Sequence, residues 1–481
     1  MIAGSHGPRL AVMMFVQYFA LGAWIVPLGT FLRTSATSGG MSFSPSEVAW
    51  IYNSSAIAAL IAPLLLGMLA DHLFSAQKLL AILNLVGAGL VFYAGQICTL
   101  HQPLIAEAAL VSAEAKSLAV KDAFQPLFIT MLAYSMCNAL ILPLTNIVSY
   151  RHLANPTKWF GPVRMLGTLG WIAVSLSLDM FGKPFSPEPL YWASAVSLLM
   201  AVYAWTLPST PPVGHGRGFR EIMGIPALKL LRLNSFRVLL ITIFILAGVQ
   251  QFYVLYANSY LKDLHAAKPT SVQSLAQVSE VVCLLFMPLI LGRFGFKWVL
   301  VFGIGCWVAR NALFATLSLP IVAGFGLPMH GLCYGLFFIV ANLYVDRKAP
   351  THLRAMAQGM FAIVSSGLGQ LFGGMLSSAV LSSLSHNDVV AWRWFWLIPA
   401  IMAAVMLIPF ILFFKEETYF EGSHERQSTP PDDGNKLAPH LPATSDSPVK
   451  SVDEGVIVVQ PKEQPSMVSE TGRCVKECVP T

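Results

Sequence analysis

Residues 272–292 read VQSLAQVSEVVCLLFMPLILG, and Glu280 is the one charged residue in this run. Its length matches the roughly 20 apolar residues that an α-helix needs to cross the hydrocarbon core of a bilayer. The whole chain has the same character, because 55% of its 481 residues are hydrophobic and 11% are charged. A soluble protein carries about 25% charged residues. The sequence therefore predicts a polytopic membrane protein and argues against a soluble enzyme.

Eleven further apolar runs of similar length surround this one. The predicted spans are 10–32, 46–70, 78–98, 126–149, 160–181, 188–207, 236–260, 272–292, 298–318, 322–345, 355–381 and 392–415. With the N-terminus inside, the cytoplasmic loops hold 15 Lys and Arg residues and the opposite loops hold 7. Cytoplasmic loops are enriched in these residues. We therefore expect a multi-pass membrane protein with both termini in the cytoplasm.

The longest cytoplasmic connection, 208–235, divides the spans into two sets of six. It is basic and amphipathic, which is typical of a segment lying along a membrane surface. Residues 63–67 (PLLLG) and 288–292 (PLILG) end equivalent spans of the two sets, which favours a transporter built from parallel repeats. We therefore predict an all-α membrane protein of twelve transmembrane helices. The N-terminal six-helix bundle would be 1–207, the basic linker 208–235, and the C-terminal six-helix bundle 236–415.

The last part of the chain differs in composition. Residues 416–481 hold twelve Asp and Glu against six Lys and Arg, and they are rich in Pro and Ser. Such a segment cannot bury enough apolar area to fold alone. We expect an acidic, disordered cytoplasmic tail, with a docking peptide around 456–459 as the alternative.

Three ionisable residues lie well inside predicted spans: Arg164, Glu280 and Arg310. Each costs about 2.5–3.5 kcal/mol at a helix centre, so such residues usually mark substrate or ion paths. Glu280 lies close to the midplane, with Gln277 on the same helical face. We interpret it as a protonatable carboxylate that lines a polar cavity. A protonated carboxyl with a purely structural role is the alternative.

Arg164, Thr168 and Trp171 follow a spacing of i, i+4 and i+7, which places them on one face of their helix. A guanidinium offers several donors and an indole offers a stacking plane, a combination suited to a polar ring with hydroxyl groups. Arg164 could instead extend to the cytoplasm. For Arg310 we favour a structural pair or the same extension to the surface.

Polar side chains also occur in three other spans. Gln251 and Asn258 share a face; the alternative is that these amides only join helices. His330 and Tyr334 follow an i, i+4 spacing and are further candidates for contact with the substrate. Gln17 and Trp24 form a weaker pair. The sequence contains neither a Walker-type phosphate loop nor an HExxH zinc motif. We expect no ATP-driven pumping, no metal site and no cofactor, and the basic charge balance does not indicate nucleic acid.

Several stretches together resemble the bacterial nucleoside–proton symporter family of the major facilitator superfamily. They are Gln17–Trp24, Pro63–Asp71, Asn146–Tyr150, Arg164–Thr168, Gln277–Glu280, Trp307–Arg310, Arg354–Phe361 and Gly373–Gly374. The segment with Gly67 and Asp71 is general to the superfamily and serves conformational change. The segments RMLGT, QVSE and AQGMF are much more specific to the nucleoside family.

The resemblance implies the major facilitator fold and proton-driven nucleoside uptake across the bacterial cytoplasmic (inner) membrane, with nucleoside and proton as ligands. We expect a monomer in the bilayer. Carried over by position, the nucleoside-contacting residues are Arg164, Thr168, Gln251, Gln277 and Glu280, with Trp171 and Tyr334 as aromatic rings. The chain departs from the family at Val254, His330 and Gly335, where an amide, a tyrosine and an acid are expected. Residues 99–125, a predicted loop, and the acidic tail also lie outside the pattern.

These observations lead to a hypothesis of alternating access in which Glu280 couples proton and nucleoside movement. A permease for another hydroxylated solute, such as a sugar, is the alternative, because the three departures leave the substrate open. A membrane sensor or scaffold that signals through residues 416–481 is the alternative from another class.

Overall fold

The computed structural model describes residues 6–72, 75–211, 225–350, 353–386 and 389–416, and the side chains of residues 63–72 lie outside this description. Almost every element is a helix, as predicted. The exception is a two-stranded antiparallel hairpin, β1 (Ser385–His386) and β2 (Val389–Val390). Residues 212–224, the middle of the predicted linker, and residues 417–481, nearly all of the predicted tail, are outside the described residues.

Long helices dominate the first part of the chain. They are α1 (Gly7–Arg33), the 3₁₀ turn η1 (Ala36–Ser38), α2 (Pro45–His72), α3 (Ala76–Val111), α4 (Ala113–His152), α5 (Pro156–Phe181) and α6 (Glu188–Ala204). Their ends follow local chemistry. Asn155 caps α5, since its side chain accepts a hydrogen bond from the amide of Lys158, and Pro156 takes the first helical position.

The second part contains more interruptions. It consists of the 3₁₀ segment η2 (Ile225–Arg232), α8 (Asn234–Asp263), α9 (Pro269–Gln273), α10 (Leu275–Phe314), α11 (Leu319–Ile321), η3 (Val322–Gly326), α12 (Met329–Cys333), η4 (Tyr334–Ile339), α13 (Val340–Lys348), α14 (Arg354–Ala362), η5 (Ile363–Gly369), α15 (Gln370–Ser383) and α16 (Trp392–Phe413). Three of these segments, η3, η4 and η5, are π-helical. A π-helical turn inside an α-helix frequently marks a functional site.

Gly295 divides α10 into two helices. Its φ of 70° lies in the left-handed region, which glycine adopts without steric cost. The break falls between the predicted spans 272–292 and 298–318. Helices cover most of each predicted span. In the described part of the chain, nine helical stretches are long and apolar enough to cross a membrane.

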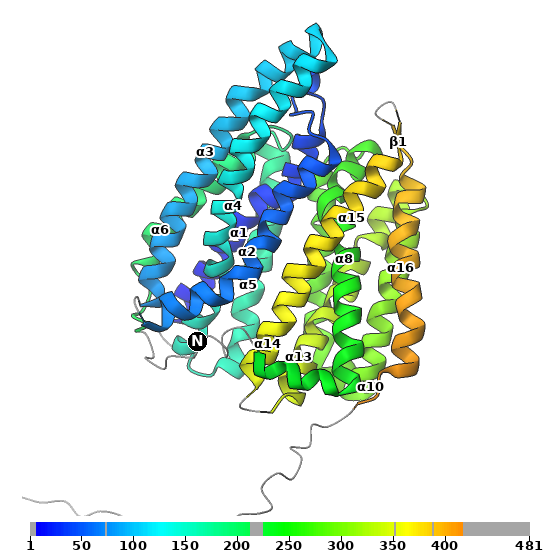
Figure 1. Cartoon of the computed structure of the whole chain (residues 1–481). Helices are drawn as coiled ribbons and strands as arrows, with labels where there is room; N and C mark the ends of the chain where they lie inside the picture. Colours follow the sequence, from blue (N-terminus) through cyan, green and yellow to red (C-terminus); the bar gives the residue numbers. More distant parts are fainter. Residues whose placement is uncertain (1–5, 73–74, 212–224, 351–352, 387–388, 417–481) are drawn as a thin grey trace, which may run out of the picture. The chain divides into compact units, whose positions relative to one another are not determined.

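The predicted loop 99–125 is helical, and the prediction was wrong there. α3 runs on to Val111, and α4 begins at Ala113 after Ser112, whose hydroxyl caps it by accepting a hydrogen bond from the Ala115 amide at 3.0 Å. The two helices continue past their neighbours at one end (Figure 1). The sequence here is rich in alanine and polar residues, which favour a helix without an apolar pattern. The helices therefore extend beyond the apolar run from which the span was predicted.

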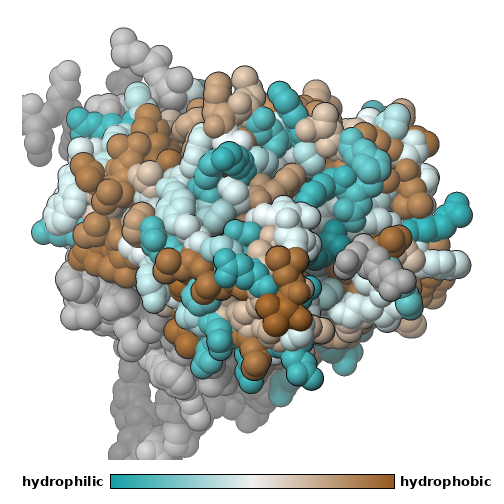
Figure 2. Space-filling view, turned by 90° about the horizontal axis from the view of Figure 1, so that it is seen from above, coloured by the Kyte–Doolittle hydropathy of each residue, from teal (hydrophilic) through white to brown (hydrophobic). Residues whose placement is uncertain are grey.

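Helix packing sets the positions of the functional side chains. α1 packs against α5 and α6, while α8 packs against α15 and α16, and α10 packs against α12 and α16. α1 also contacts α8, and α2 contacts α15, so the early and late helices meet (Figure 1). Large apolar side chains such as Leu285 and Leu289 are exposed on the outer face of α10, as expected of a surface that faces lipid. Hydrophilic residues cover much of the end of the molecule seen from above (Figure 2).

Candidate functional site

A cavity of about 220 Å³ lies between the early helices α1 and α5 and the later elements α8, α9, α10, α12 and η4. Its volume is just below the roughly 300–1,000 Å³ that is usual for small-molecule pockets. The lining residues are Tyr18, Ile25, Val26, Arg164, Thr168, Trp171, Gln250, Tyr253, Val254, Gln273, Gln277, Glu280, His330 and Tyr334. Aromatic, amide and ionisable side chains therefore surround one central space.

α5 supplies the basic corner of this cavity. Arg164, Thr168 and Trp171 all line it, as their spacing on one helical face predicts. The Arg164 guanidinium carbon lies 4.0 Å from the centre of the Tyr18 ring on α1, a cation–π contact. The side chain therefore stays within the cavity wall instead of extending to the cytoplasm. Gly167 leaves room for the Tyr18 ring, since a Cβ there would lie 2.7 Å from it.

α10 supplies the acidic corner. Gln277 and Glu280 line the cavity, whereas Val278, Val282 and Leu285 are exposed on the opposite side of the helix. In the described part of the chain, no ion pair of 4.0 Å or less involves Glu280. The carboxyl group therefore faces a polar space that it shares with Arg164, without a direct pair.

α12 brings His330 to the same wall, and η4 brings Tyr334. Gly331 permits the close approach, because a Cβ at this position would lie 2.2 Å from the amide nitrogen of Glu280. The Gly331 amide donates a hydrogen bond to the Ser279 hydroxyl at 3.0 Å. The ring of His330 stacks on Tyr253, with centroids 4.7 Å apart, and lies 6.1 Å from the ring of Tyr334.

Arg310 lies behind His330 and is completely buried. Its guanidinium lies 4.3 Å from the Trp307 ring and 4.7 Å from the Tyr253 ring, and Nη1 is 2.9 Å from His330 Nδ1. The side chain therefore does not reach the membrane surface. It forms a structural pair, as we favoured, but its partner is a histidine.

Gln251 and Asn258 do not line the cavity. Both are buried, and Asn258 joins helices instead, since its side chain accepts a hydrogen bond from Thr30 and donates one to Gln273. Gln250, the neighbour of Gln251, takes the cavity position. In α1, Gln17 is buried, and Trp24 donates a hydrogen bond to the Tyr134 hydroxyl at 3.1 Å.

Sequence reasoning also missed some lining residues: Tyr18, Ile25, Val26, Gln250, Tyr253 and Gln273. Gln250, Tyr253 and Val254 follow the i, i+3, i+4 spacing of one helical face, and this signal could have found them. Val254 does line the cavity. Gly335 lies behind the wall, where a Cβ would be 2.7 Å from the Cys283 sulfur. Gly67 and Asp71 lie in α2, and their side chains are outside the described residues.

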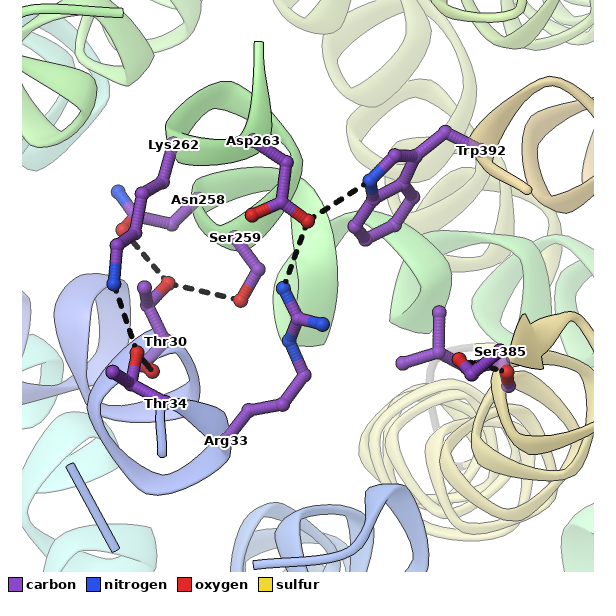
Figure 3. Close-up of polar contacts among 10 residues, drawn as sticks. Thr30, Arg33, Thr34, Asn258, Ser259, Lys262, Asp263, Ser385 and Trp392 are labelled. Atoms are coloured by element: carbon purple, nitrogen blue, oxygen red, sulfur yellow. Dashed lines mark hydrogen bonds and ion pairs between the residues drawn. The ribbon is translucent and has the colours of Figure 1, made fainter. Parts of the chain in front are cut away.

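Polar contacts join α1, α8 and α16 (Figure 3) one to two helical turns beyond Val26 and Val254, which line the cavity. Arg33, at the end of α1, forms an ion pair of 3.1 Å with Asp263, at the end of α8. Asp263 also accepts a hydrogen bond of 3.0 Å from the Trp392 indole of α16. One turn closer to the cavity, the Thr30 hydroxyl donates to Asn258 at 2.9 Å and contacts Ser259 at 3.1 Å. These contacts join helices from both parts of the chain.

A second cavity, of about 230 Å³, lies next to the first and shares Gln250 and Tyr334 with it. Its other lining residues are Ala247, Phe338, Ile339, Asn342, Phe361, Ser365, Ser366 and Gln370. Most of these belong to the π-helical segments η4 and η5 or lie next to them. No cluster of His, Cys, Asp or Glu suited to a metal ion occurs among the residues with described positions.

Comparisons with known proteins point in one direction. The model of the nucleoside H⁺ symporter family matches residues 5–115 and 104–419. The transporter YegT of Escherichia coli (strain K12) is 32% identical over 427 residues, covering 85% of this chain and 93% of that protein. The nucleoside permease NupG of the same organism is 27% identical over 427 residues, covering 85% and 95%. A crystal structure of the nucleoside transporter NupG superimposes with a TM-score of 0.72 at 25% identity, covering 86% of this chain and 100% of that one.

Proposed function

The chain belongs to the nucleoside H⁺ symporter family, and we propose that the cavity between α1, α5, α8 and α10 is its nucleoside site. The protein is a proton-coupled nucleoside transporter of the membrane, and not an enzyme. The single observation that carries the site is that Arg164 and Glu280, two of the three Arg, Lys, Asp or Glu residues that lie well inside the predicted spans, line the same cavity.

The proposed architecture has twelve transmembrane helices in two six-helix bundles, 1–207 and 236–415. Three features support twelve helices instead of the nine apolar stretches found in the described residues. The helices α2 and α6 are not among the nine, and Gly295 divides α10, which was counted once, into two. The excess of Lys and Arg in alternate loops supports cytoplasmic termini, which makes the end with Arg33 and Asp263 the outer end. We propose that the protein acts as a monomer, with 208–235 as a linker and 416–481 as a cytoplasmic tail.

Recognition of the nucleoside would use both sides of the cavity. Arg164 and Thr168 offer donors to ribose hydroxyls or base carbonyls, and Gln250 and Gln277 can both donate and accept. Trp171, Tyr18 and Tyr334 provide aromatic surfaces for the base. Gln251 is replaced by Gln250 in this proposal because only Gln250 lines the cavity.

Coupling is assigned to Glu280, the only carboxylate in the lining of this cavity. A charged carboxylate without a partner is costly to enclose in a closed, dry state. Binding of a proton neutralises it, so the loaded protein can change between outward-open and inward-open states at lower cost. Release of nucleoside and proton on the cytoplasmic side then resets the transporter, with the two bundles moving around a fixed site. The ion pair of Arg33 and Asp263, which joins the ends of α1 and α8, supports an outer gate that is shut in this structure.

The test is uptake of labelled uridine and adenosine by proteoliposomes, with and without an imposed proton gradient. The proposal requires accumulation above the external concentration when the outside is acidic, and loss of accumulation when a protonophore removes the gradient. Excess unlabelled nucleosides should inhibit uptake, and excess sugars should not. Inhibition by a sugar alone, or accumulation without the gradient, would contradict the proposal.

A further inference from the structure

The most unusual side chain outside the nucleoside site is Arg310, a guanidinium with no exposed surface. Of its nitrogens, Nε and Nη2 have no hydrogen-bond partner among the described residues, and no acidic side chain there lies within 4.0 Å of it. A charge in this position is unfavourable unless contacts stabilise it. The contacts that it does make therefore indicate its role.

Those contacts are two aromatic rings and one histidine. Trp307 and Tyr253 lie within 4.3 and 4.7 Å of the guanidinium carbon, which fixes its plane. Nη1 then meets His330 Nδ1 at 2.9 Å. The histidine cannot easily turn away, because its ring also stacks on Tyr253 with centroids 4.7 Å apart and planes 21° apart.

The chemistry of the two groups determines the direction of this hydrogen bond. A guanidinium has donors and no acceptor, whereas a histidine nitrogen accepts only when it carries no proton. Nδ1 must therefore be the acceptor, and the ring is neutral with its proton on Nε2. His330 lines the nucleoside cavity, while Arg310 does not. The ring nitrogen left for a bound molecule is Nε2, as an N–H donor.

We propose that Arg310 is a positioning residue that fixes the Nε2–H form of His330, so that His330 donates a hydrogen bond to the nucleoside. This inference rests on the proposed function. The recognised atom is an acceptor of the substrate: a base carbonyl oxygen, a base ring nitrogen or a ribose hydroxyl oxygen. If the ring carried its proton on Nδ1, Nε2 would face that acceptor with a lone pair, and the bond would be lost. Arg310 therefore acts on substrate recognition without touching the substrate.

Uptake kinetics of labelled uridine test this role. His330→Phe keeps a ring and removes the donor, so we expect KM to rise about two- to tenfold, the range for one hydrogen bond, with the maximal rate changed less than twofold. Arg310→Met should raise KM by a similar factor, since without the guanidinium the proton of His330 can occupy either ring nitrogen. The double variant should show no further rise, because both changes remove the same bond. Arg310→Lys, which keeps a charged donor, should restore most of the affinity.

Three kinetic results would contradict this role of Arg310. If the two single changes multiply in the double variant, or if Arg310→Met leaves the uridine KM unaltered, Arg310 does not act through His330. A lowered maximal rate with unaltered KM would also contradict the proposal, since it would indicate a structural role only.

Nitrogen-15 NMR of the unmodified protein avoids the risk that Arg310→Met fails to fold. The protein is labelled at histidine, and the signals of His330 are identified as those missing from the spectrum of His330→Gln. We expect a protonated Nε2 and an unprotonated Nδ1, and the reverse pattern would overturn the inference. The measurement does not depend on transport. If the protein fails to accumulate uridine, the proposed function is wrong while the tautomer can still be read.

Discussion

The backbone amide of Gly331 donates a hydrogen bond of 3.0 Å to the hydroxyl of Ser279, which holds α12 directly against α10. The neighbours of these two residues, Glu280 and His330, line the same cavity. One interhelical contact therefore sets the distance between the proposed coupling group and a second titratable side chain. Small residues allow such close helix packing in membranes.

Gly331→Ala should disturb this wall. Its Cβ would lie 2.2 Å from the Glu280 nitrogen and 2.3 Å from the Ser279 carbonyl carbon, so the backbones must separate. Overpacking of this kind costs about 1–3 kcal/mol. We expect a lower melting temperature in detergent and a fall in uridine uptake of about tenfold. Gly305→Ala is the control, since nothing lies within 4 Å of a Cβ there; equal behaviour of the two variants would show that the contact is not required.

Loss of the Arg33–Asp263 ion pair should favour opening of the outer end. The two side chains are 20% and 35% exposed, so the pair contributes at most about 1 kcal/mol. Asp263→Asn should therefore increase the outward-open population up to about fivefold. The measurement is the distance between spin labels at Thr37 and Ala267, which are exposed on the two sides of this end.

The control for this prediction is Glu188→Gln. It removes a 4.0 Å ion pair with Lys183, which lies in the connection from α5 to α6 and does not involve the later helices. It should leave the distance distribution unchanged. A distribution that does not respond to Asp263→Asn either would exclude the ion pair from the gate.

The second cavity should be the route by which the nucleoside leaves toward the cytoplasm, because it shares Gln250 and Tyr334 with the first. Ser366→Trp places a large ring in this space. We expect uridine uptake to fall by about tenfold or more, while uridine affinity in detergent changes less than about twofold. Ser366→Ala should transport normally. Normal uptake by Ser366→Trp would show that the nucleoside does not pass this cavity.

Much of the fold could be predicted because membrane spans have a strong composition signal. In a bilayer, a long apolar run with few charges is stable as an α-helix, because the helix satisfies the backbone hydrogen bonds internally. The same logic missed the helical extension at 99–125, where the sequence is polar enough for water and apolar periodicity no longer reports on structure. The apolar pattern does not reveal the π-helical segments η4 and η5 either, since they differ from an α-helix only in hydrogen bonds that span one more residue.

The cavity lining was predictable where a residue type is costly in the membrane. Arg164 and Glu280 stood out in this way, and both line the cavity, as do Thr168 and Trp171 from the same helical face as Arg164. Uncharged residues gave less information. Gln250 and Gln251 are adjacent and chemically equal, so only the rotation of α8 decides which of them faces the cavity. The pairing of Arg310 with His330 depends on contacts between α10 and α12, which sequence spacing does not contain.

The most direct test of the central claim is Glu280→Gln in proteoliposomes that contain the purified transporter, compared with Glu107→Gln, a change at an exposed carboxylate of α3. Two readings are taken from the same preparation: accumulation of labelled uridine driven by a proton gradient, and exchange of labelled for unlabelled uridine without a gradient. If Glu280 couples the proton to the nucleoside, Glu280→Gln keeps the exchange and loses the accumulation, while Glu107→Gln keeps both. Gradient-driven accumulation by Glu280→Gln at the level of the unaltered protein would contradict the account.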